Sequence, residues 1–482
     1  MIYLTIDIGT SSTKVCLFRP DGSLWHSRSA SYPVNRPQPG WAEQDPRAWW
    51  QTASALCRAL LAEAGNPPVR AVSLSGQAPL CVPIDRHGRP LRPAILWLDR
   101  RAAPQASWLK ERLGEEEAVR LSGNLLDAYF GGVKWLWFRR EEPELYARTW
   151  KIAQAQTYLA WHLTGQAVTD PSHAGMCSPC FNLQERRWDE RICELMNLDL
   201  DRLPEIHPST EIIGEITRQA AVETGLEAGT PVVCGGGDFA CACLGAGALT
   251  PGQGALMLGT AGNLLVPALE RTDPRLINTL HLTGERLSMG GVLAGEVITW
   301  VRGLFGNPPL EALEAEAARV PPGAEGLLFL PYLMGERTPV WDARARGVYF
   351  GISSLHNRAH FYRAALEGVA FAFREIAAIF AALGRPLHEV IILDGGARSP
   401  LWRQIFADAL GLPVRWRPNS PGTSHGAAFL AALAMADAPG WGALQRWLEP
   451  TLDTLPRPEA QPIYAGRFAV YRQLYGRLKD LF

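Results

Sequence analysis

Hydrophobic and polar positions at the start of the chain predict a β-hairpin. Residues 2–8 are apolar apart from two polar positions, residues 9–13 are rich in turn formers, and residues 14–18 are largely apolar again. Two apolar runs joined by a short segment of glycine and hydroxyl residues are typical of paired strands. We therefore expect paired strands to dominate the first residues of the chain.

The next segment carries the signals of a capped helix followed by a buried strand. Apolar positions recur at helical spacing over residues 46–61, after Asp45 as N-cap and before Gly65 as C-terminal cap. An apolar strand is predicted over residues 69–74. Strands and capped helices keep alternating along the chain, which predicts the α/β class with mixed sheets.

A long helix is predicted over residues 357–384. Its apolar positions recur every three or four residues, which is typical of a helix face packed on a core. These positions are Phe361, Ala365, Val369, Phe373 and Ile376. The tryptophan pairs near residues 49–50 and 135–137 are interpreted as packing residues in the same way.

Composition and charge narrow the class of protein. The chain has 482 residues with a net charge of −1 and 20% charged residues, which favours a globular protein of two or three domains. Such a balance offers no basic face, so we expect no nucleic-acid or membrane partner. The N-terminal residues resemble no signal peptide and no apolar run approaches roughly 18 residues, so we expect a cytoplasmic protein.

Nine cysteines are present in the chain, most of them in apolar surroundings. Reduced, buried thiols explain them best. Cys177 and Cys180 have CxxC spacing with His173 nearby, but a structural zinc site needs four ligands and no second pair exists.

A domain boundary is expected in the glycine-rich and alanine-rich segment 245–254, which gives domains 1–247 and 248–482. A short internal sequence similarity supports a duplication. Residues 6–11 and residues 257–262 are both apolar strands that end in Gly-Thr and small residues.

The first Gly-Thr turn is a candidate phosphate site. Backbone amides and hydroxyls in such a turn can point at one anion, and a second turn could grip the same polyphosphate. Asp7 precedes the turn where a carboxylate could hold Mg²⁺ through water, and Lys14 follows where a cation could meet a phosphate. An ordinary hairpin explains one turn alone equally well. The turn residues are Gly9, Thr10, Ser11, Ser12 and Thr13 in the first case and Gly259, Thr260, Ala261 and Gly262 in the second.

Two further glycine segments end apolar strands. Gly395 and Gly396 precede a helix capped by Ser399 and allow flat approach of an adenosine, although a plain strand-to-helix turn is as good an interpretation. The segment 235–237 leaves Asp238 at a strand end, where a general base would lie within reach of a substrate proton. The alternative role for Asp238 is to cap the following helix.

These features, in this order, resemble the FGGY carbohydrate kinases within the sugar kinase, Hsp70 and actin superfamily. The resemblance covers essentially the whole chain and is nearest to the xylulokinase branch. The matching segments are 7–14, 41–46, 92–97, 235–238, 258–262, 329–333, 335–339, 347–352, 363–369 and 395–399.

The resemblance implies two RNase H-like domains that close an interdomain cleft around a sugar and MgATP. It implies that domain 1–247 carries the sugar site, the first phosphate turn and the catalytic base Asp238, and that domain 248–482 carries the second turn and the adenosine site. Asp7, with Asp238, would hold Mg²⁺, and Lys14 would lie near the γ-phosphate. The implied adenosine-binding residues are Gly395, Gly396 and Ser399.

The expected sugar pocket departs from xylulokinases at three positions. Relatives usually carry Gln-Met-His-Gly where this chain has Gln77-Ala78-Pro79-Leu80, and they carry Asn in place of Leu98 and of Phe239. All three changes remove polar groups, so we expect a more apolar pocket that suits a ligand with fewer hydroxyls. The expected substrate contacts are Gln77, Ala78, Pro79, Leu98, Asp99, Asp238 and Phe239, with Asp99 equally explained as part of a solvated charge cluster.

The predicted function is an ATP-dependent phosphotransferase with an alcohol acceptor, nominally a kinase of the primary hydroxyl of D-xylulose. One alternative is a kinase of another, less hydroxylated ketose, polyol or sugar acid. The other is a catalytically weak sugar-sensing ATPase, since the scaffold alone does not dictate transfer. A homodimer is possible if the C-terminal helix packs against a second subunit.

Overall fold

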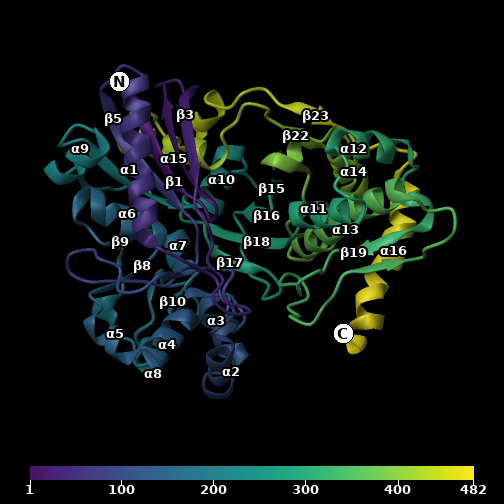
Figure 1. The fold of residues 1–482 in the computed structure, drawn as a ribbon, viewed down its shortest axis with the longest axis horizontal. Helices are drawn as coiled ribbons and strands as arrows, with labels where there is room; N and C mark the ends of the chain where they lie inside the picture. The colour runs from purple at the N-terminus through teal and green to yellow at the C-terminus, as the bar shows by residue number, and fades with distance from the viewer. The chain divides into compact units, whose positions relative to one another are not determined.

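The computed structural model describes all residues from Met1 to Phe482 and divides into two units (Figure 1). Unit 1 comprises Met1–Gly247, Asn278–Leu287 and Ser420–Leu448, and unit 2 comprises Ala248–Ile277, Ser288–Asn419 and Glu449–Phe482. The first division falls where the sequence predicts it. The domain predicted over 248–482 is wrong in its later part, because segments 278–287 and 420–448 pack with unit 1.

Unit 1 is built on a mixed sheet of six strands in the order β13-β14-β5-β1-β2-β3. The predicted hairpin is confirmed, because β1 and β2 pair antiparallel, whereas β1, β5 and β14 run parallel. The strands are β1 Ile2–Ile8, β2 Ser12–Phe18, β3 Leu24–Ser31, β5 Val69–Gly76, β13 Ile212–Glu215 and β14 Pro231–Gly237. Short strands outside this sheet are β4 Glu43–Gln44, β6 Val82–Ile84, β7 Ala94–Ile95, β8 Lys151–Ala153, β9 Val168–Thr169, β10 Phe181–Asn182, β11 Arg187–Trp188 and β12 Glu205–Ile206.

Helices cover both faces of this sheet. The first helix begins as predicted, with Asp45 accepting a hydrogen bond from the Arg47 amide at 3.0 Å. Helices α1 and α6 pack against the sheet, as do α10 and α15. The helices of unit 1 are α1 Pro46–Glu63, α2 Ala103–Arg112, α3 Glu115–Ser122, α4 Gly131–Glu141, α5 Pro143–Arg148, α6 Ala155–Thr164, α7 Pro171–Gly175, α8 Glu190–Leu195, α9 Arg218–Thr224, α10 Asp238–Ala246 and α15 Thr423–Ala434.

Strand β1 is apolar on both faces because it lies between these helix layers. Leu4 and Ile6 belong to the core cluster that also contains Trp49 of α1. Tyr3 points the other way and donates to Asp437, just beyond α15, at 2.7 Å. A strand buried on both faces has no alternating polar side, which explains the nearly continuous apolar run in the sequence.

The second sheet has the order β17-β18-β16-β15-β21-β22-β23, and its strands β16, β15, β21, β22 and β23, which lie in unit 2, repeat the strand plan of unit 1. Strands β15 and β16 form an antiparallel hairpin and β21 joins β15 in parallel, as β5 joins β1, so the expected duplication is confirmed. The strands are β15 Gln253–Leu258, β16 Ala261–Pro267, β17 Ile277–Leu280, β18 Arg286–Leu293, β21 Glu389–Leu393, β22 Val414–Trp416 and β23 Leu452–Thr454, with β19 Leu328–Leu330 and β20 Val348–Phe350 as a separate pair.

The helices of unit 2 surround a second core. The long predicted helix is confirmed as α13, whose first turn is closed by a capping box of Asn357 and His360. Four of its five predicted core positions are fully buried and Phe361 is partly buried. The C-terminal helix α16 buries Tyr464 and Tyr471 within this core. The helices are α11 Gly295–Leu304, α12 Leu310–Arg319, α13 Arg358–Ala382, α14 Pro400–Leu410 and α16 Gln461–Leu478.

All nine cysteines are buried thiols without disulfides. No helix is both long and apolar enough to cross a bilayer. No group of three or more histidine, cysteine or carboxylate side chains is placed to hold a metal ion, Cys177 and Cys180 included.

Candidate active site

Three parallel strands of unit 1 end in one row. Ile8 of β1 is in register with Gly76 of β5, which is in register with Gly237 of β14. Neighbouring strands lie about 4.8 Å apart, so the segments that follow these three residues leave the sheet at the same edge. Ligands of open α/β sheets bind outside the carboxyl ends of the strands, and this edge is the candidate site of unit 1.

A carboxylate is held just inside this edge. Ser75 on β5 donates its hydroxyl to Oδ1 of Asp7 at 2.5 Å, and Lys14 lies opposite Asp7 across the hairpin. Burial raises the pKa of Asp7, whereas the Ser75 hydrogen bond and the Lys14 charge act to lower that pKa. Asp7 thus offers a hard oxygen ligand beside two groups that favour its ionised form.

The first glycine turn is rigid and still offers donors. Gly9 donates its amide to the carbonyl of Ser12 at 2.9 Å, and the amides of Thr10 and Ser11 bond to no backbone acceptor. Tyr32 closes the turn from outside by donating to the Gly9 carbonyl at 2.7 Å. The turn therefore keeps amides and hydroxyls for an anion, which is the chemistry expected of a phosphate site.

Thr13 differs from the other turn residues. Its side chain is fully buried, and its hydroxyl bonds to the Tyr32 hydroxyl at 3.4 Å. Thr13 is the first paired residue of the hairpin, opposite Ile8. We therefore assign Thr13 to the inner wall of the hairpin and exclude it from the proposed phosphate contacts.

Two residues that the sequence analysis left without a role brace this turn. Gln44 donates from Nε2 to the carbonyl of Thr10 at 2.6 Å, and its Oε1 accepts from Gln77 at 3.1 Å. Trp97 donates from Nε1 to the Thr10 hydroxyl at 2.9 Å. Gln44 and Trp97 lie in the segments 41–46 and 92–97, which carry the sequence resemblance described above. That resemblance was the one signal that could have pointed to these two residues.

The segment after β5 forms a fixed wall with few polar groups. Residues 77–80 are all buried. The Gln154 amide holds Leu80 from both sides, accepting from its amide at 2.8 Å and donating to its carbonyl at 3.1 Å. Ala78 and Pro79 add no polar side-chain atom. The Oε1 atom of Gln77 is buried without a hydrogen-bond partner, so it is an acceptor that a ligand or water could satisfy.

Asp99 differs from its expected role at the sugar site. The residue is fully buried, its Oδ2 accepts from the Ala42 amide at 2.6 Å, and its carboxylate pairs with Arg101 at 2.7 Å. The Arg101 guanidinium in turn lies over the Trp41 ring at 3.5 Å. Asp99 supports the loop from inside, so we remove it from the proposed sugar contacts, while its neighbour Leu98 is only partly buried.

Asp238 is the first residue of α10 and is partly buried. Its Oδ1 accepts from the Phe239 amide at 2.7 Å, and its carbonyl accepts from Thr423 of α15 at 3.4 Å. The positive end of a helix dipole favours a carboxylate at this position. Phe239 is 5% exposed, and its ring lies where a Cβ on Gly237 would stand, at 2.6 Å. The N-cap of α10 is Gly237, without a side-chain cap, so Asp238 lies at the strand end as the first residue of the helix and does not cap it.

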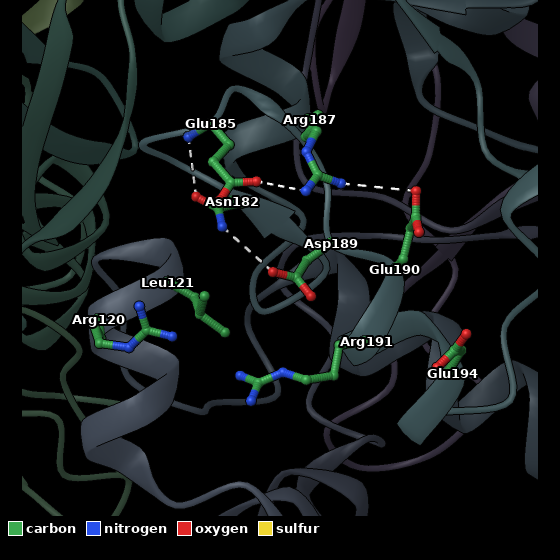
Figure 2. Close-up of a pocket in the computed structure, with 9 residues that line it drawn as sticks. All are labelled: Arg120, Leu121, Asn182, Glu185, Arg187, Asp189, Glu190, Arg191 and Glu194. Atoms are coloured by element: carbon green, nitrogen blue, oxygen red, sulfur yellow. Dashed lines mark hydrogen bonds and ion pairs between the residues drawn. The ribbon is translucent and has the colours of Figure 1, made fainter.

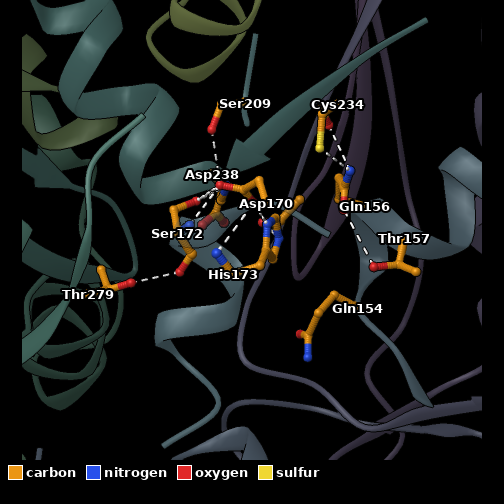
Figure 3. A network of polar contacts seen from close by, with 12 residues as sticks. Gln154, Gln156, Thr157, Asp170, Ser172, His173, Ser209, Cys234, Asp238 and Thr279 are labelled. Atoms are coloured by element: carbon orange, nitrogen blue, oxygen red, sulfur yellow. Dashed lines mark hydrogen bonds and ion pairs between the residues drawn. The ribbon is translucent and has the colours of Figure 1, made fainter. Parts of the chain in front are cut away.

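A buried polar network lies next to Asp238 (Figure 3). It is centred on Asp170, Ser172 and His173 at the start of α7, all less than 2% exposed. From the sequence, His173 has a candidate role only beside the CxxC pair, and Asp170 and Ser172 have no predicted role. A signal was present, because Asp-Pro-Ser-His after an apolar segment is a helix-start pattern.

The second Gly-Thr turn, in unit 2, is shorter than the first. Three residues separate the paired Leu258 and Gly262, whereas four separate Ile8 and Thr13. Gly259 donates its amide to the Ala261 carbonyl at 3.1 Å, and the first amides of α11 donate to the carbonyls of the turn. Thr260 is exposed, so its hydroxyl remains available to a ligand.

The predicted adenosine turn lies beside this turn, because β21 pairs in parallel with β15. A Cβ on Gly396 would lie 2.7 Å from the Leu258 side chain, whereas a Cβ on Gly395 would meet nothing within 4 Å. Ser399 accepts from the Trp402 amide at 3.0 Å and caps α14 as predicted. Gly396 is thus required by packing, and Gly395 leaves open space where a flat ring could approach.

A separate surface pocket of about 400 Å³ lies between α3, β10, β11 and α8 (Figure 2). It contains none of the predicted site residues, and most of its charged side chains pair with neighbours. Arg187 pairs with Glu185 at 2.6 Å, Arg120 pairs with Glu117 at 2.6 Å, and Asn182 donates to Asp189 at 3.3 Å.

Comparisons with known proteins agree with this geometry. Residues 2–245 match the N-terminal domain and residues 258–435 the C-terminal domain of the FGGY family of carbohydrate kinases. The chain is 32% identical over 486 residues to a xylulose kinase of Escherichia coli, covering both chains fully. It is 28% identical to a gluconokinase of Bacillus subtilis over 99% of this chain and 96% of that one. The crystal structure of a xylulose kinase from Rhodospirillum rubrum superposes with a TM-score of 0.92 at 32% identity, over 100% of this chain and 99% of that one.

Proposed function

The chain belongs to the FGGY family of carbohydrate kinases, ATP-using phosphotransferases with an alcohol acceptor, and from this premise we propose that it phosphorylates the primary hydroxyl of a ketopentose, nominally D-xylulose. The observation that carries the proposal is the common row of strand ends in unit 1. Three features follow directly from this row: the first glycine turn, the wall of residues 77–80, and Asp238. The full-length likeness to xylulose kinases supports the named acceptor.

Asp238 is the proposed general base. It accepts the proton of the primary hydroxyl as the sugar oxygen bonds to the γ-phosphorus, and the bond from that phosphorus to the bridging oxygen breaks to release ADP. Its place at the start of α10 puts the carboxylate at the positive end of the helix dipole, which favours a negative charge there. The Oδ1 atom of this carboxylate also accepts a hydrogen bond from the Phe239 amide.

The donor site fits a polyphosphate in its chemistry. In unit 1, the amides and hydroxyls of Thr10 and Ser11 and the hydroxyl of Ser12 would bind phosphate oxygens, with Lys14 as the nearby cation. In unit 2, Thr260 and its turn would do the same. Gly395 leaves the open space that an adenine or ribose needs, and Gly396 sets the backbone beside it.

Asp7 and Asp238 are the proposed residues that hold Mg²⁺. Carboxylate oxygens with intervening water suit this ion, and Asp7 meets that requirement beside Ser75. When bound, Mg²⁺ supplies positive charge that offsets the charge of the phosphate oxygens. Lys14 lies opposite Asp7 on the paired strand and would add a second positive charge beside the metal.

The test is ADP release coupled to mass detection of the phosphosugar, with MgATP and a panel of pentuloses, polyols, sugar acids and deoxyketoses. We expect a signal with D-xylulose that Asp238→Ala removes. Gluconate belongs in the panel because a gluconokinase is among the relatives. Phosphate transfer to gluconate and none to D-xylulose would refute the named acceptor.

A second candidate is a kinase for a less hydroxylated acceptor. It is favoured by the apolar side chains of Pro79, Leu98 and Phe239 at positions expected to face the sugar. Each lost hydrogen bond to a hydroxyl is worth about 1 kcal/mol, so an acceptor without those hydroxyls loses nothing at these positions. A signal confined to deoxyketoses would establish this candidate over the first.

Two remaining alternatives have their own readouts. A sugar-sensing ATPase would bind ligands without making any phosphosugar. A homodimer stays a prediction, measured by light scattering during size-exclusion chromatography. Within unit 2 the C-terminal helix α16 already buries Tyr464, Tyr471 and Leu474, so its apolar face is occupied by its own chain.

A further inference from the structure

We propose that the start of α7, through Ser172 and His173 held by Asp170, is a positioning unit that sets two strand ends of the active site. The inference rests on the proposed function, because it assigns this unit to the base Asp238 and to the acceptor wall after Gly76. These three residues are referred to as the α7 clamp.

Ser172 contacts the strand end that carries the base. The amide of Gly237, directly before Asp238, donates to the Ser172 hydroxyl oxygen at 2.9 Å. That hydroxyl donates its own proton to Oδ2 of Asp170 at 2.5 Å. Gly237 is the last residue of β14, so this contact fixes the peptide from which α10 and its carboxylate begin.

His173 contacts the neighbouring strand end. Its Nε2 lies 3.1 Å from the carbonyl oxygen of Gly76, and its Nδ1 lies 2.6 Å from Oδ1 of Asp170. A carbonyl oxygen only accepts, so Nε2 carries a proton and donates it. Gly76 directly precedes Gln77, where the wall begins.

Asp170 joins the two contacts into one unit. Its Oδ2 also accepts from the Ser172 amide at 2.8 Å and from Ser209 at 3.3 Å, and its Oδ1 accepts from the His173 amide at 3.3 Å. All of these groups are buried (Figure 3). A buried network that is fully hydrogen-bonded is rigid, and neither Ser172 nor His173 can move without breaking a bond to Asp170.

Gly236 packs closely against Leu282 and the clamp. A Cβ on Gly236 would lie 2.3 Å from the Leu282 side chain and 3.3 Å from both the Asp170 carboxylate and the Ser172 hydroxyl. Glycine at this position lets β14 approach the clamp closely enough for the Gly237 amide to reach Ser172. The glycines of 235–237 therefore serve the placement of Asp238 as well as the turn of the backbone.

The test uses Ser172→Ala, which deletes a single oxygen, in place of Asp170 variants, which strand a buried partner and endanger folding. With MgATP and the acceptor found for the wild type, we expect kcat to fall about 10- to 100-fold, as for a displaced catalytic group. We expect the KM for ATP to change less than about twofold. The matched control is Ser122→Ala, a buried serine of α3 that bonds to Ala118 and Ser178.

A second readout is independent of the acceptor. Amide hydrogen exchange at Gly237 should accelerate in Ser172→Ala and stay unchanged in Ser122→Ala. Unchanged exchange at Gly237, or an equal loss of kcat in Ser122→Ala, would overturn the inference. Absence of any phosphosugar from the wild type would refute the kinase proposal instead, and the exchange at Gly237 would still decide whether the clamp holds this strand end.

Discussion

Ser75 donates its hydroxyl to Oδ1 of Asp7 at 2.5 Å from the neighbouring parallel strand, and the two residues are in register. The serine therefore sets the direction of the carboxylate that lies just before the first Gly-Thr turn. A hydrogen bond to a charged group is worth about 1.5 to 3 kcal/mol. Because Asp7 is the proposed metal ligand, the effect of this bond should appear in phosphoryl transfer.

We expect Ser75→Ala to lower kcat about tenfold, the lower end of that range, in the ADP-release assay at saturating MgATP. The control is Ser73→Ala on the same strand. Ser73 is equally buried, and its hydroxyl has no hydrogen-bond partner. Ser73→Ala should therefore keep the wild-type rate, and equal losses in the two variants would show that Ser75 acts only through the stability of β5.

A second prediction concerns Gln44, which donates to the Thr10 carbonyl at 2.6 Å. Gln44→Leu removes this brace and the oxygen that accepts from both Gln77 and Trp49, so the turn should sample other conformations in the absence of ATP. We expect the KM for ATP to rise about five- to tenfold, as for the loss of one to two hydrogen bonds, with a smaller change in kcat. Gln105→Leu is the control, because Gln105 is also buried but bonds to Glu141 on α4. An unchanged KM for ATP in Gln44→Leu would remove the first turn from the ATP site.

The parts of the fold that the sequence predicted are those with local causes. The caps at Asp45 and Ser399 each use a side chain within three residues of the amide that it satisfies. The two Gly-Thr turns follow from hairpins whose partner strands are adjacent in the sequence. Such features need no knowledge of distant packing.

The parts that the sequence missed depend on distant contacts. Helix α15 joins unit 1 because Gly426 approaches α10 so closely that a Cβ there would lie 2.0 Å from the Cys241 carbonyl. Asp99 and Arg101 looked like a solvated cluster because neighbouring charges usually are. Their burial comes from Trp41 and Ala42, which are more than 50 residues away in the sequence. The α7 clamp was missed for the same reason, since Gly76 and Gly237 lie far from Ser172 along the chain.

A third prediction follows from the revised role of Asp99. Asp99→Asn should lower the free energy of unfolding by about 3 kcal/mol, because it takes one carboxylate from a buried arginine and weakens the hold on Ala42. The KM for the acceptor should stay near the wild-type value. Asp127→Asn is the control, since Asp127 pairs with the partly exposed Arg100 and such pairs are worth at most about 1 kcal/mol. Denaturant titration and initial rates measure both quantities, and a raised acceptor KM with unchanged stability would restore Asp99 to the sugar site.

A fourth prediction concerns pH. Lys134 is fully buried and donates to the carbonyls of Ala128 and Tyr129, each at 2.5 Å. Burial lowers the pKa of Lys134 to about 7 from its ordinary value of 10.5. Between these values the unfolded chain binds the extra proton, so stability should rise with pH, by up to about 1.4 kcal/mol per unit.

The measurement is the free energy of unfolding at several values between about pH 7 and pH 9. Above this window the buried thiols act in the opposite direction, because burial raises the pKa of Cys57 and Cys81 to about 12 from 9.0. In Lys134→Met, we expect the free energy of unfolding not to rise with pH as it does in the wild type. Lys110→Met, at an exposed lysine paired with Glu115, should keep it. A slope that survives in Lys134→Met would show that the lysine is charged in the folded state throughout this range.

The last prediction tests Leu98, one of the three apolar side chains expected to face the sugar. Leu98 is partly buried beside Trp97, which is bonded to the first turn, and it is the least enclosed of the three apolar replacements. Leu98→Asn restores an amide that can bond to a sugar hydroxyl, worth about 1 kcal/mol or roughly fivefold in kcat/KM. The ratio of kcat/KM for D-xylulose to that for a deoxyketose should therefore rise about fivefold, whichever acceptor the wild type prefers. Leu98→Ala removes the same apolar group without adding an amide, so it should leave the ratio unchanged, and an equal shift in both variants would mean that Leu98 acts by bulk alone.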